Sequence, residues 1–396
     1  MAKYQLVFEK VNSDLENLPM PRSGHRCSTD GVFLYCFGGF NPEKHNKLFY
    51  ENIWCFHLSS KTWHKVITAS CNSGQIPTCV ASSVAFLHRG KLFVFGGSGY
   101  PFGMKNSNGM FYIDPKKQLW HYLTQTNDVV PSPGYGQGIA MDSDKRMYIF
   151  GGTKGLTYYN ELHKFNFETC KWELIQATEP PSGRYRHEMV AIENGFAVIG
   201  GYGIHGACSL DKLPVYNYGT CLWDEVICQE DPVHGFPEPR RAHSCVQYED
   251  NVYVCGGFKE ERKDQIFDDI WKLNIKTFSW SKIPQVMPSP TYFHSAAVTK
   301  AGCMYIFGGI QQAREDSSAE WNQRTNNLLK MWLVIPPLER LCWEALCETI
   351  PQGQRFDTAK LGNLGLPRYL LTDYDAQFLV GLENDDIYES CYAFQV

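Results

Sequence analysis

Four histidines recur at one position of a repeated pattern in the sequence, and histidine is the commonest metal ligand in proteins. They are His25, His187, His243 and His294. At most one falls in each copy of the repeat, tens of residues from the next, and the third copy has Gln137 there instead. Ligands spread in this way around a repeat array do not form a cluster. We therefore expect no metal site, and we expect these side chains to hydrogen-bond within their own copies of the repeat.

Arginine and aromatic residues lie just before these histidines or just after the glycine pairs of the repeat. The candidates are Arg22, Arg184, Tyr185, Arg186, Tyr202, Arg240, Arg241, Phe258 and Tyr292. Arginine holds a carboxylate through two parallel hydrogen bonds, and aromatic rings form rigid apolar walls. The set predicts a site for a short peptide with an anionic end. The alternative is that some of these arginines are solvated or paired with loop carboxylates.

Motifs for catalysis do not occur in this sequence. It has no nucleophile elbow, no Walker loop, no HExxH and no paired-carboxylate signature. Gly134-Tyr135-Gly136 lacks the strand-to-helix context that a phosphate-binding loop needs. We expect a non-catalytic protein without a cofactor.

Six apolar runs that each end in Gly-Gly define the repeat. The doublets begin at Gly38, Gly96, Gly151, Gly200, Gly256 and Gly308, which are 58, 55, 49, 56 and 52 residues apart. Five copies carry a tryptophan 20 to 24 residues after the second glycine, at Trp63, Trp120, Trp172, Trp223 and Trp280. Strand-like segments around these positions give each copy four strands. We expect the tryptophans to pack between copies.

The repeat resembles the kelch family of β-propellers, whose unit is ~50 residues long. The resemblance implies an all-β fold, a six-bladed propeller over residues 1–335. Physical reasoning agrees, because one four-stranded blade cannot bury a core alone, whereas stacked blades in a closed ring cover each other. The sixth copy lacks its tryptophan, and Phe8 aligns with Trp63. We therefore expect a strand within residues 4–11 to complete the last blade.

A helical pattern follows the repeats. Leu338, Leu341, Cys342, Ala345 and Leu346 recur at helical spacing after Pro337. The segment matches the Elongin BC-binding box of cullin-RING ligase receptors, which implies contacts to Elongin B and C by Leu338, Leu341, Cys342 and Leu346. The alternative is a helix that only caps the propeller.

A second segment resembles the cullin box that binds a cullin-2-type scaffold. It contains Leu366, Pro367 and Leu370, and Asp357 can cap a short helix before it, with Gly365 at that helix's end. Together the two motifs imply a helical box over residues 336–373, followed by a tail over 374–396.

Composition sets limits on the partners. The chain has 396 residues, a net charge of -5 and 15 cysteines. This charge predicts no attraction to nucleic acid or membranes. The first residues contain no apolar signal segment, no window is long enough to span a membrane, and the cysteines lack ligand or disulfide spacing. We expect a cytoplasmic or nuclear protein with reduced thiols.

Propeller and box together resemble the kelch receptors of cullin-RING E3 ubiquitin ligases that bind C-terminal degrons. The resemblance implies targets that end in small residues such as Gly or Ala. The paired arginines of the best-understood relative have no counterpart, because Tyr202 and Phe258 stand in such places. Two alternatives remain, a kelch scaffold for actin or signalling partners and a kelch-fold metalloenzyme.

Overall fold

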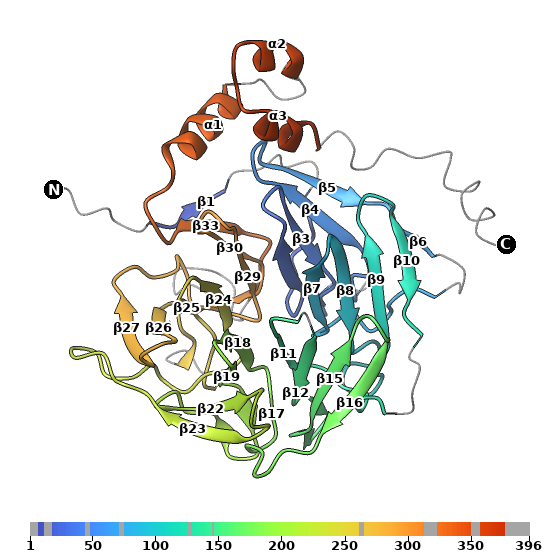
Figure 1. Ribbon diagram of the computed structural model, residues 1–396, viewed down its shortest axis with the longest axis vertical. Helices are drawn as coiled ribbons and strands as arrows, with labels where there is room; N and C mark the ends of the chain where they lie inside the picture. The colour runs from blue at the N-terminus through green and yellow to red at the C-terminus, as the bar shows by residue number, and fades with distance from the viewer. Residues whose placement is uncertain are drawn as a thin grey trace.

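Short strands follow one another around a ring, and three helices stand at its edge (Figure 1). The computed structural model describes residues 7–11, 18–43, 48–70, 75–124, 129–144, 146–260, 265–312, 323–349 and 357–376. Strands dominate these residues, as the sequence predicts.

Six sheets make up the ring, and each has four main strands. The first contains β2 (Arg26–Thr29), β3 (Phe33–Phe37), β4 (Ile53–His57) and β5 (Thr62–Val66). The second contains β7 (Val84–His88), β8 (Lys91–Phe95), β9 (Met110–Asp114) and β10 (Leu119–Tyr122), with the short β6 (Ala69–Ser70) parallel to β10. The third contains β11 (Gly138–Met141), β12 (Met147–Phe150), β15 (Leu162–Asn166) and β16 (Lys171–Ile175).

The other three sheets repeat this antiparallel order. The fourth contains β18 (Glu188–Ile192), β19 (Gly195–Ile199), β22 (Lys212–Asn217) and β23 (Trp223–Ile227). The fifth contains β24 (Ser244–Tyr248), β25 (Asn251–Cys255), β26 (Ile270–Asn274) and β27 (Ser279–Ile283). The sixth contains β29 (Ser295–Val298), β30 (Cys303–Phe307), β33 (Leu328–Trp332) and β1 (Glu9–Lys10).

The sixth sheet joins the two ends of the repeat region. β1 pairs antiparallel with β33, with Glu9 opposite Lys330 and Lys10 opposite Leu329. The start of the chain thus supplies the outer strand of the last sheet, where the alignment of Phe8 with Trp63 places it.

A small extra layer of hairpins covers one end of the ring, which we call the hairpin face. It contains β13 (Thr153–Lys154), β14 (Thr157–Tyr158), β17 (Arg184–Tyr185), β20 (Tyr202–Gly203), β21 (Gly206–Ala207), β28 (Thr291–Tyr292), β31 (Ile310–Gln311) and β32 (Gln323–Arg324). Single bridges take the same place in the other sheets, for example Ala81 with Ser98 and Arg241 with Phe258. In every sheet, the residue after the glycine doublet meets a residue just before the first strand.

One residue from each sheet joins a closed circle of backbone hydrogen bonds. The six residues, each with positive φ, are Gly24, Ser82, Gly136, Arg186, Ala242 and Phe293. The amide of each donates to the carbonyl of its counterpart in the preceding sheet at 2.8 to 3.1 Å, and Gly24 donates to Phe293. The circle connects the sixth sheet back to the first without an interruption.

The recurrent histidines lie directly beneath this circle, and two of them hydrogen-bond to a neighbouring sheet. His25 Nε2 lies 3.0 Å from the Phe307 carbonyl of the sixth sheet, and His294 Nε2 lies 2.9 Å from Ser244 Oγ of the fifth. The prediction that they bond within their own copies is therefore wrong for these two. Burial lowers the pKa of His187 to about 3 and that of His294 to about 4, so both rings are neutral.

The regular spacing of the tryptophans reflects their packing between neighbouring sheets, as the sequence predicts. Trp120 contacts Phe37 of the preceding sheet, with ring centroids 5.5 Å apart. Trp172 and Phe95 repeat this contact at 5.1 Å. Such aromatic pairs bury large areas of each ring and fix the angle between sheets.

The first glycine of each doublet makes room for the next sheet, which leads to a stability prediction. A Cβ on Gly200, where φ is +61°, would lie 2.5 Å from the Arg240 carbonyl oxygen and 2.7 Å from His243 Cε1. Gly155 has a similar φ of +66° but no atom within 4 Å of such a Cβ. We expect Gly155→Ala to lower the free energy of unfolding by about 1 kcal/mol through backbone strain alone, and Gly200→Ala by about 3 kcal/mol, in urea titrations. Equal losses would contradict the steric explanation.

The helices are α1 (Leu338–Glu348), α2 (Thr358–Asn363) and α3 (Arg368–Asp375). Asp357 caps α2 by accepting from the amide of Lys360 at 3.0 Å, and Gly365 follows that helix with φ of +89°, as the sequence predicts. No helix in the described ranges has the length and apolar character needed to cross a membrane.

Polar contacts hold the helices against the first and sixth sheets, at the end of the ring opposite the hairpin face. Lys330 Nζ of β33 pairs with Glu344 at 2.5 Å, and Trp343 Nε1 donates to Ser59 Oγ at 3.1 Å. His57 Nε2 donates to the Asp373 carbonyl at 2.8 Å. A cavity of about 250 Å³ remains between the helices and the strand turns.

Candidate functional site

Three of the predicted arginines, Arg22, Arg184 and Arg240, have a structural role. All three are buried. Each donates from Nε to the carbonyl two residues earlier, and from Nη1 to the first glycine carbonyl of its own doublet at 3.0 to 3.3 Å. Their guanidinium groups are engaged within the sheets, so the prediction that these three bind a ligand carboxylate is wrong. Arg184 also borders a cavity of about 440 Å³, whose charged lining is mixed and includes Asp211, Lys212 and Glu225.

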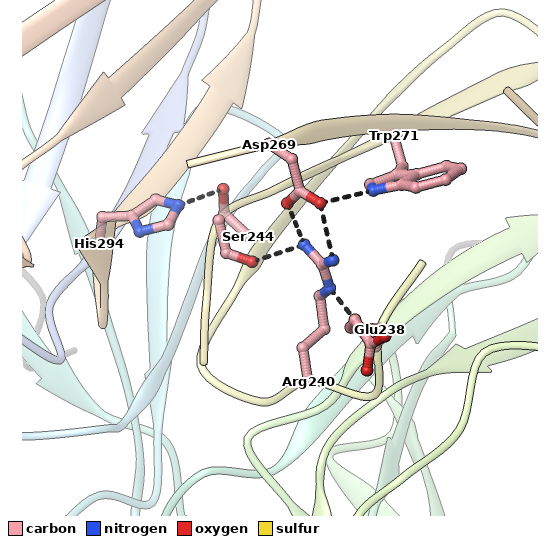
Figure 2. A network of polar contacts seen from close by, with 7 residues as sticks. Glu238, Arg240, Ser244, Asp269, Trp271 and His294 are labelled. Carbon is pink, nitrogen blue, oxygen red and sulfur yellow. Dashed lines mark hydrogen bonds and ion pairs between the residues drawn. The ribbon is translucent and has the colours of Figure 1, made fainter. Parts of the chain in front are cut away.

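Arg240 shows this role most fully, in the network of Figure 2. Its guanidinium makes a bidentate pair with Asp269, at 2.6 and 3.1 Å, and Trp271 Nε1 donates to the same carboxylate at 2.7 Å. Burial acts to raise the pKa of Asp269, but the charge and hydrogen bonds of Arg240, with the Trp271 bond, outweigh it and lower the pKa. Asp269 therefore stays ionised and fixes the third strand of this sheet to the segment before the first.

Arg241, the next residue, points in a different direction and meets the predicted tyrosines. Its Nη1 donates to the Tyr185 hydroxyl at 3.0 Å. Its guanidinium carbon lies 3.8 Å from the ring centroid of Tyr202 and 4.5 Å from that of Phe258. No carboxylate pairs with Arg241 within the part of the chain that the structure describes. Its charge is held between aromatic faces, where it remains able to attract an anion.

Arg186 lies at the centre of the hairpin face and reaches across the ring from the fourth sheet. Its Nη2 donates to Ser82 Oγ of the second sheet, and its guanidinium carbon lies 4.5 Å from the ring centroid of Phe293 in the sixth. Burial, and next the charge of Arg26, lower its pKa to about 10. Among the described residues, no ion pair compensates this charge, so a bound anion would relieve the electrostatic cost.

Phe258 and Tyr292 support the site from below. Both are buried, and their ring centroids lie 4.5 Å apart. Phe258 still contacts the Arg241 guanidinium, whereas Tyr292 packs on Phe258 and Phe293. Both rings belong to the core beneath the face, so neither forms the accessible wall that the sequence predicts.

Other aromatic residues that were not candidates extend the group. Tyr158 stacks on Tyr185 with centroids 5.7 Å apart, and Tyr135 lies edge-on to Tyr185 at 6.2 Å. We call Arg186, Arg241, Tyr135, Tyr158, Tyr185 and Tyr202 the arginine–tyrosine cluster. Tyr158 escapes sequence reasoning because its hairpin strand follows the glycine doublet at a distance that differs from sheet to sheet.

Polar groups also lie deeper in the ring, beneath the circle of backbone hydrogen bonds. A cavity of about 180 Å³ lies beneath the circle, and the Arg26–Glu188 ion pair crosses it at 2.6 Å. One described group, His25, Cys27 and Cys36, has potential metal-binding atoms within 4.8 Å of one another. The sequence spacing did not indicate this group. All three side chains are buried, and the positive charge of Arg22 acts on Cys36, so a divalent cation would add to a buried positive charge.

The predicted Elongin-binding residues fall mostly on the outward side of α1. Leu338 is 74% exposed, and Leu341 and Cys342 are also exposed, whereas Leu346 is half-buried. The helix is anchored by Trp343 and Cys347, which pack with Leu370, Leu371 and Tyr374. The apolar residues of α1 therefore form two faces, one packed against α3 and one exposed to solvent, which we call the open face.

The predicted cullin-binding residues differ in accessibility. Pro367 is exposed and caps the start of α3, and Leu366 is half-buried. Leu370 is buried in the cluster that joins α1 to α3. Leu370 thus stabilises the helices in this arrangement, and its contact with a cullin stays a prediction.

Comparison with known proteins agrees with the repeat and the sheet order. A family model described as the KLHDC2/KLHL20/DRC7 Kelch-repeats domain matches residues 9–201, 102–309 and 187–345. The chain belongs to the kelch-repeat family. The predicted kelch repeats and propeller-like fold are thereby confirmed.

Several relatives of this kelch-repeat protein match nearly its whole length. Kelch domain-containing protein 10 of Rattus norvegicus is 39% identical over 365 residues, covering 89% of this chain and 85% of the relative. The Homo sapiens protein of that name is also 39% identical, with 79% of it covered. The Kelch domain-containing protein 10 homolog of Drosophila melanogaster is 32% identical over 379 residues, which are 88% of this chain and 61% of the relative.

Proposed function

We propose that this kelch-repeat protein is the substrate-recognition subunit of a cullin-2-type RING E3 ubiquitin ligase. In this proposal, residues 1–335 form a six-bladed propeller that binds the C-terminal degron of target proteins. Residues 336–373 form a box that binds Elongin B, Elongin C and the cullin. The chain is then a non-catalytic adaptor of the cytoplasm or nucleus and needs no cofactor.

The open face of α1 is the observation that carries the proposal. Leu338 and Cys342 are exposed one turn apart, although the same helix is fixed to the protein by Trp343 and Cys347. An anchored helix with a free apolar ridge fits the groove of a partner, where leucine anchors fill pockets. A helix that only capped the ring would bury this ridge.

The arginine–tyrosine cluster supports the substrate end of the proposal. Two guanidinium groups without a carboxylate partner among the described residues, Arg186 and Arg241, lie among tyrosine rings. A peptide C-terminus brings a carboxylate that arginine can hold with charge-assisted hydrogen bonds. In the proposed complex, the terminus lies against this cluster.

Co-expression tests the adaptor role. The full chain, produced with tagged Elongin B and Elongin C, is expected to co-elute with them, and a chain lacking residues 337–396 is not. Cullin-2 added to the three-protein complex should join it. A scaffold protein would keep its partners without Elongin, and co-elution of the truncated chain would contradict the proposal.

Arg241→Ala is expected to weaken binding of a peptide with a free C-terminal carboxylate by at least tenfold. Loss of one charge-assisted hydrogen bond costs about 1.5–3 kcal/mol, and 1.4 kcal/mol is a factor of ten in Kd. The probe is a pair of fluorescein-labelled decapeptides ending in Gly, one as the acid and one as the amide, read by fluorescence anisotropy. Arg240→Met is not a suitable control because it breaks the ion pair with Asp269. Lys259→Ala serves instead, because Lys259 follows the glycine doublet of the same sheet and forms only an exposed ion pair. Equal binding of acid and amide by the unchanged protein would refute the carboxylate site.

A further inference from the structure

Among the residues that the structure describes, the hairpin face has an apolar half and a charged half. Exposed apolar side chains stand on the hairpins of the second, third and fourth sheets: Tyr100, Phe102, Met104, Leu156 and Ile204. The described hairpin residues of the fifth, sixth and first sheets carry ion pairs instead. Lys259 pairs with Glu238 at 3.4 Å, and Arg324 pairs with Glu43 at 3.1 Å.

A continuous row of aromatic rings connects the cluster at the centre to the apolar half. Arg241 bonds to Tyr185, the Tyr185 centroid lies 6.2 Å from that of Tyr135, and Tyr135 lies 5.0 Å from Phe102. Tyr135 is buried, whereas Phe102 is 43% exposed and Met104 is more exposed still, so the outer end of the row is its accessible part. We call the rings of Tyr185, Tyr135 and Phe102, together with the side chain of Met104 at their outer end, the aromatic row. It runs from the fifth sheet's arginine to the second sheet's hairpin, where Phe102 also stacks on Phe40 of the first sheet with ring centroids 5.5 Å apart.

We propose that the aromatic row binds the residues just before the C-terminus of the substrate, and that it selects aromatic or large aliphatic side chains there. This inference rests on the proposed binding of C-termini. The terminal carboxylate at Arg241 sets the starting point, and the apolar half sets the direction in which the peptide leaves the face. The occupant is therefore a C-terminal segment that is anionic at its end and apolar just before it.

Length and surface chemistry determine which substrate positions are selected. An extended chain advances at most about 3.3–3.6 Å per residue, so the two centroid steps of the row accommodate about three residues. These are the second to fourth residues from the terminus. Exposed apolar rings next to a charged anchor are typical of binding surfaces, because burying them against an apolar side chain is favourable. A segment with acidic or basic residues at these positions does not obtain this favourable free energy of burial.

A display library tests the selection directly. Random decapeptides with free C-termini are selected on the full chain, and the enriched residues are counted by position. We expect Phe, Tyr, Trp, Leu or Met to be enriched at the second to fourth positions from the end. For the best enriched peptide, Phe102→Ser should lower the affinity about tenfold, and serine at the enriched peptide positions should do the same.

A matched variant and a double-mutant cycle separate the row from the face as a whole. Lys259→Ser lies on the corresponding hairpin of the charged half and should change the affinity less than twofold. Phe102→Ser combined with the serine peptide should cost no more than either change alone, because both remove one contact. Additive losses, equal effects of Phe102→Ser and Lys259→Ser, or no positional enrichment would each overturn the inference.

The same peptides distinguish this inference from the proposed carboxylate site. If the enriched peptide binds equally well as acid and amide, the carboxylate site fails, and with it the direction assigned to the row. If the acid form binds better but the positions before it show no preference, the carboxylate site stands and the aromatic row is refuted.

Discussion

Leu338→Arg combined with Cys342→Arg is expected to abolish co-purification with Elongin B and Elongin C. The two side chains lie one helical turn apart on the open face of α1, so two arginines would place like charges in the centre of the apolar contact. Truncating one central anchor costs 2 kcal/mol or more, and burying an unpaired charge costs further. The loss should exceed a thousandfold in Kd, which a pull-down from co-expressing cells would record as absence of Elongin.

Leu364→Arg provides the matched control for this change. Leu364 is 76% exposed, close to the 74% of Leu338, but it lies at the end of α2 and outside the proposed contact. Elongin should bind this variant normally. Circular dichroism should show unchanged folding in both variants, since Trp343 and Cys347 keep α1 in place. Retained Elongin in the double variant would refute the adaptor function.

The overall fold could be predicted because it is repeated. Six glycine doublets at nearly constant spacing, five tryptophans in register and the missing sixth tryptophan together indicate sheets, their contacts and the place of β1. Each signal reflects a packing constraint that recurs in every copy, so chance has little influence. The bonding of His25 and His294 to the neighbouring sheet escaped prediction, because the register of a residue does not show on which side of its sheet the side chain lies.

The site was harder to predict because neighbouring residues of one type have opposite roles. Arg240 and Arg241 are adjacent in sequence, yet one is bonded inside its sheet and the other lies between tyrosine rings. Successive residues of an extended segment point to opposite sides, so the sequence identifies the pair without telling which member is free. Phe102 and Tyr158 were missed because the hairpins vary in length and lack a repeat register.

The helical box illustrates a related limit. The spacing of Leu338, Leu341, Cys342 and Leu346 indicates a single apolar stripe. In the structure, Trp343 and Cys347 form a second apolar side, which holds α1 against α3. A helix has two apolar faces when its own protein covers one side and a partner covers the other. Periodicity alone does not tell which face packs within the protein and which contacts the partner.

Asp269→Ala is expected to destabilise the protein by about 3–5 kcal/mol, the largest loss among the stability changes considered. Arg240 is fully buried, and without Asp269 its charge keeps only backbone carbonyls and the ring of Phe267 as partners among the described residues. Breaking a buried pair by removing one member costs this much because the other charge is left uncompensated. Urea unfolding at pH 7 measures the difference, and Glu238→Ala, which removes only the exposed pair with Lys259, should cost about 1 kcal/mol or less.

The pH dependence of the destabilisation by Asp269→Ala tests whether the ion pair with Arg240 causes it. The folded-state pKa of Asp269 is lowered, so the pair stabilises the protein above the unfolded pKa of about 3.9 and this contribution disappears as the pH falls through the folded value. The difference between the unchanged protein and Asp269→Ala should therefore be constant from pH 8 to 5 and shrink below about pH 4. Arg240→Met with Asp269→Leu removes both charges and should recover most of the stability, since no buried charge remains. A double variant as unstable as Asp269→Ala would show that the geometry of the network, and not its charge, stabilises this sheet.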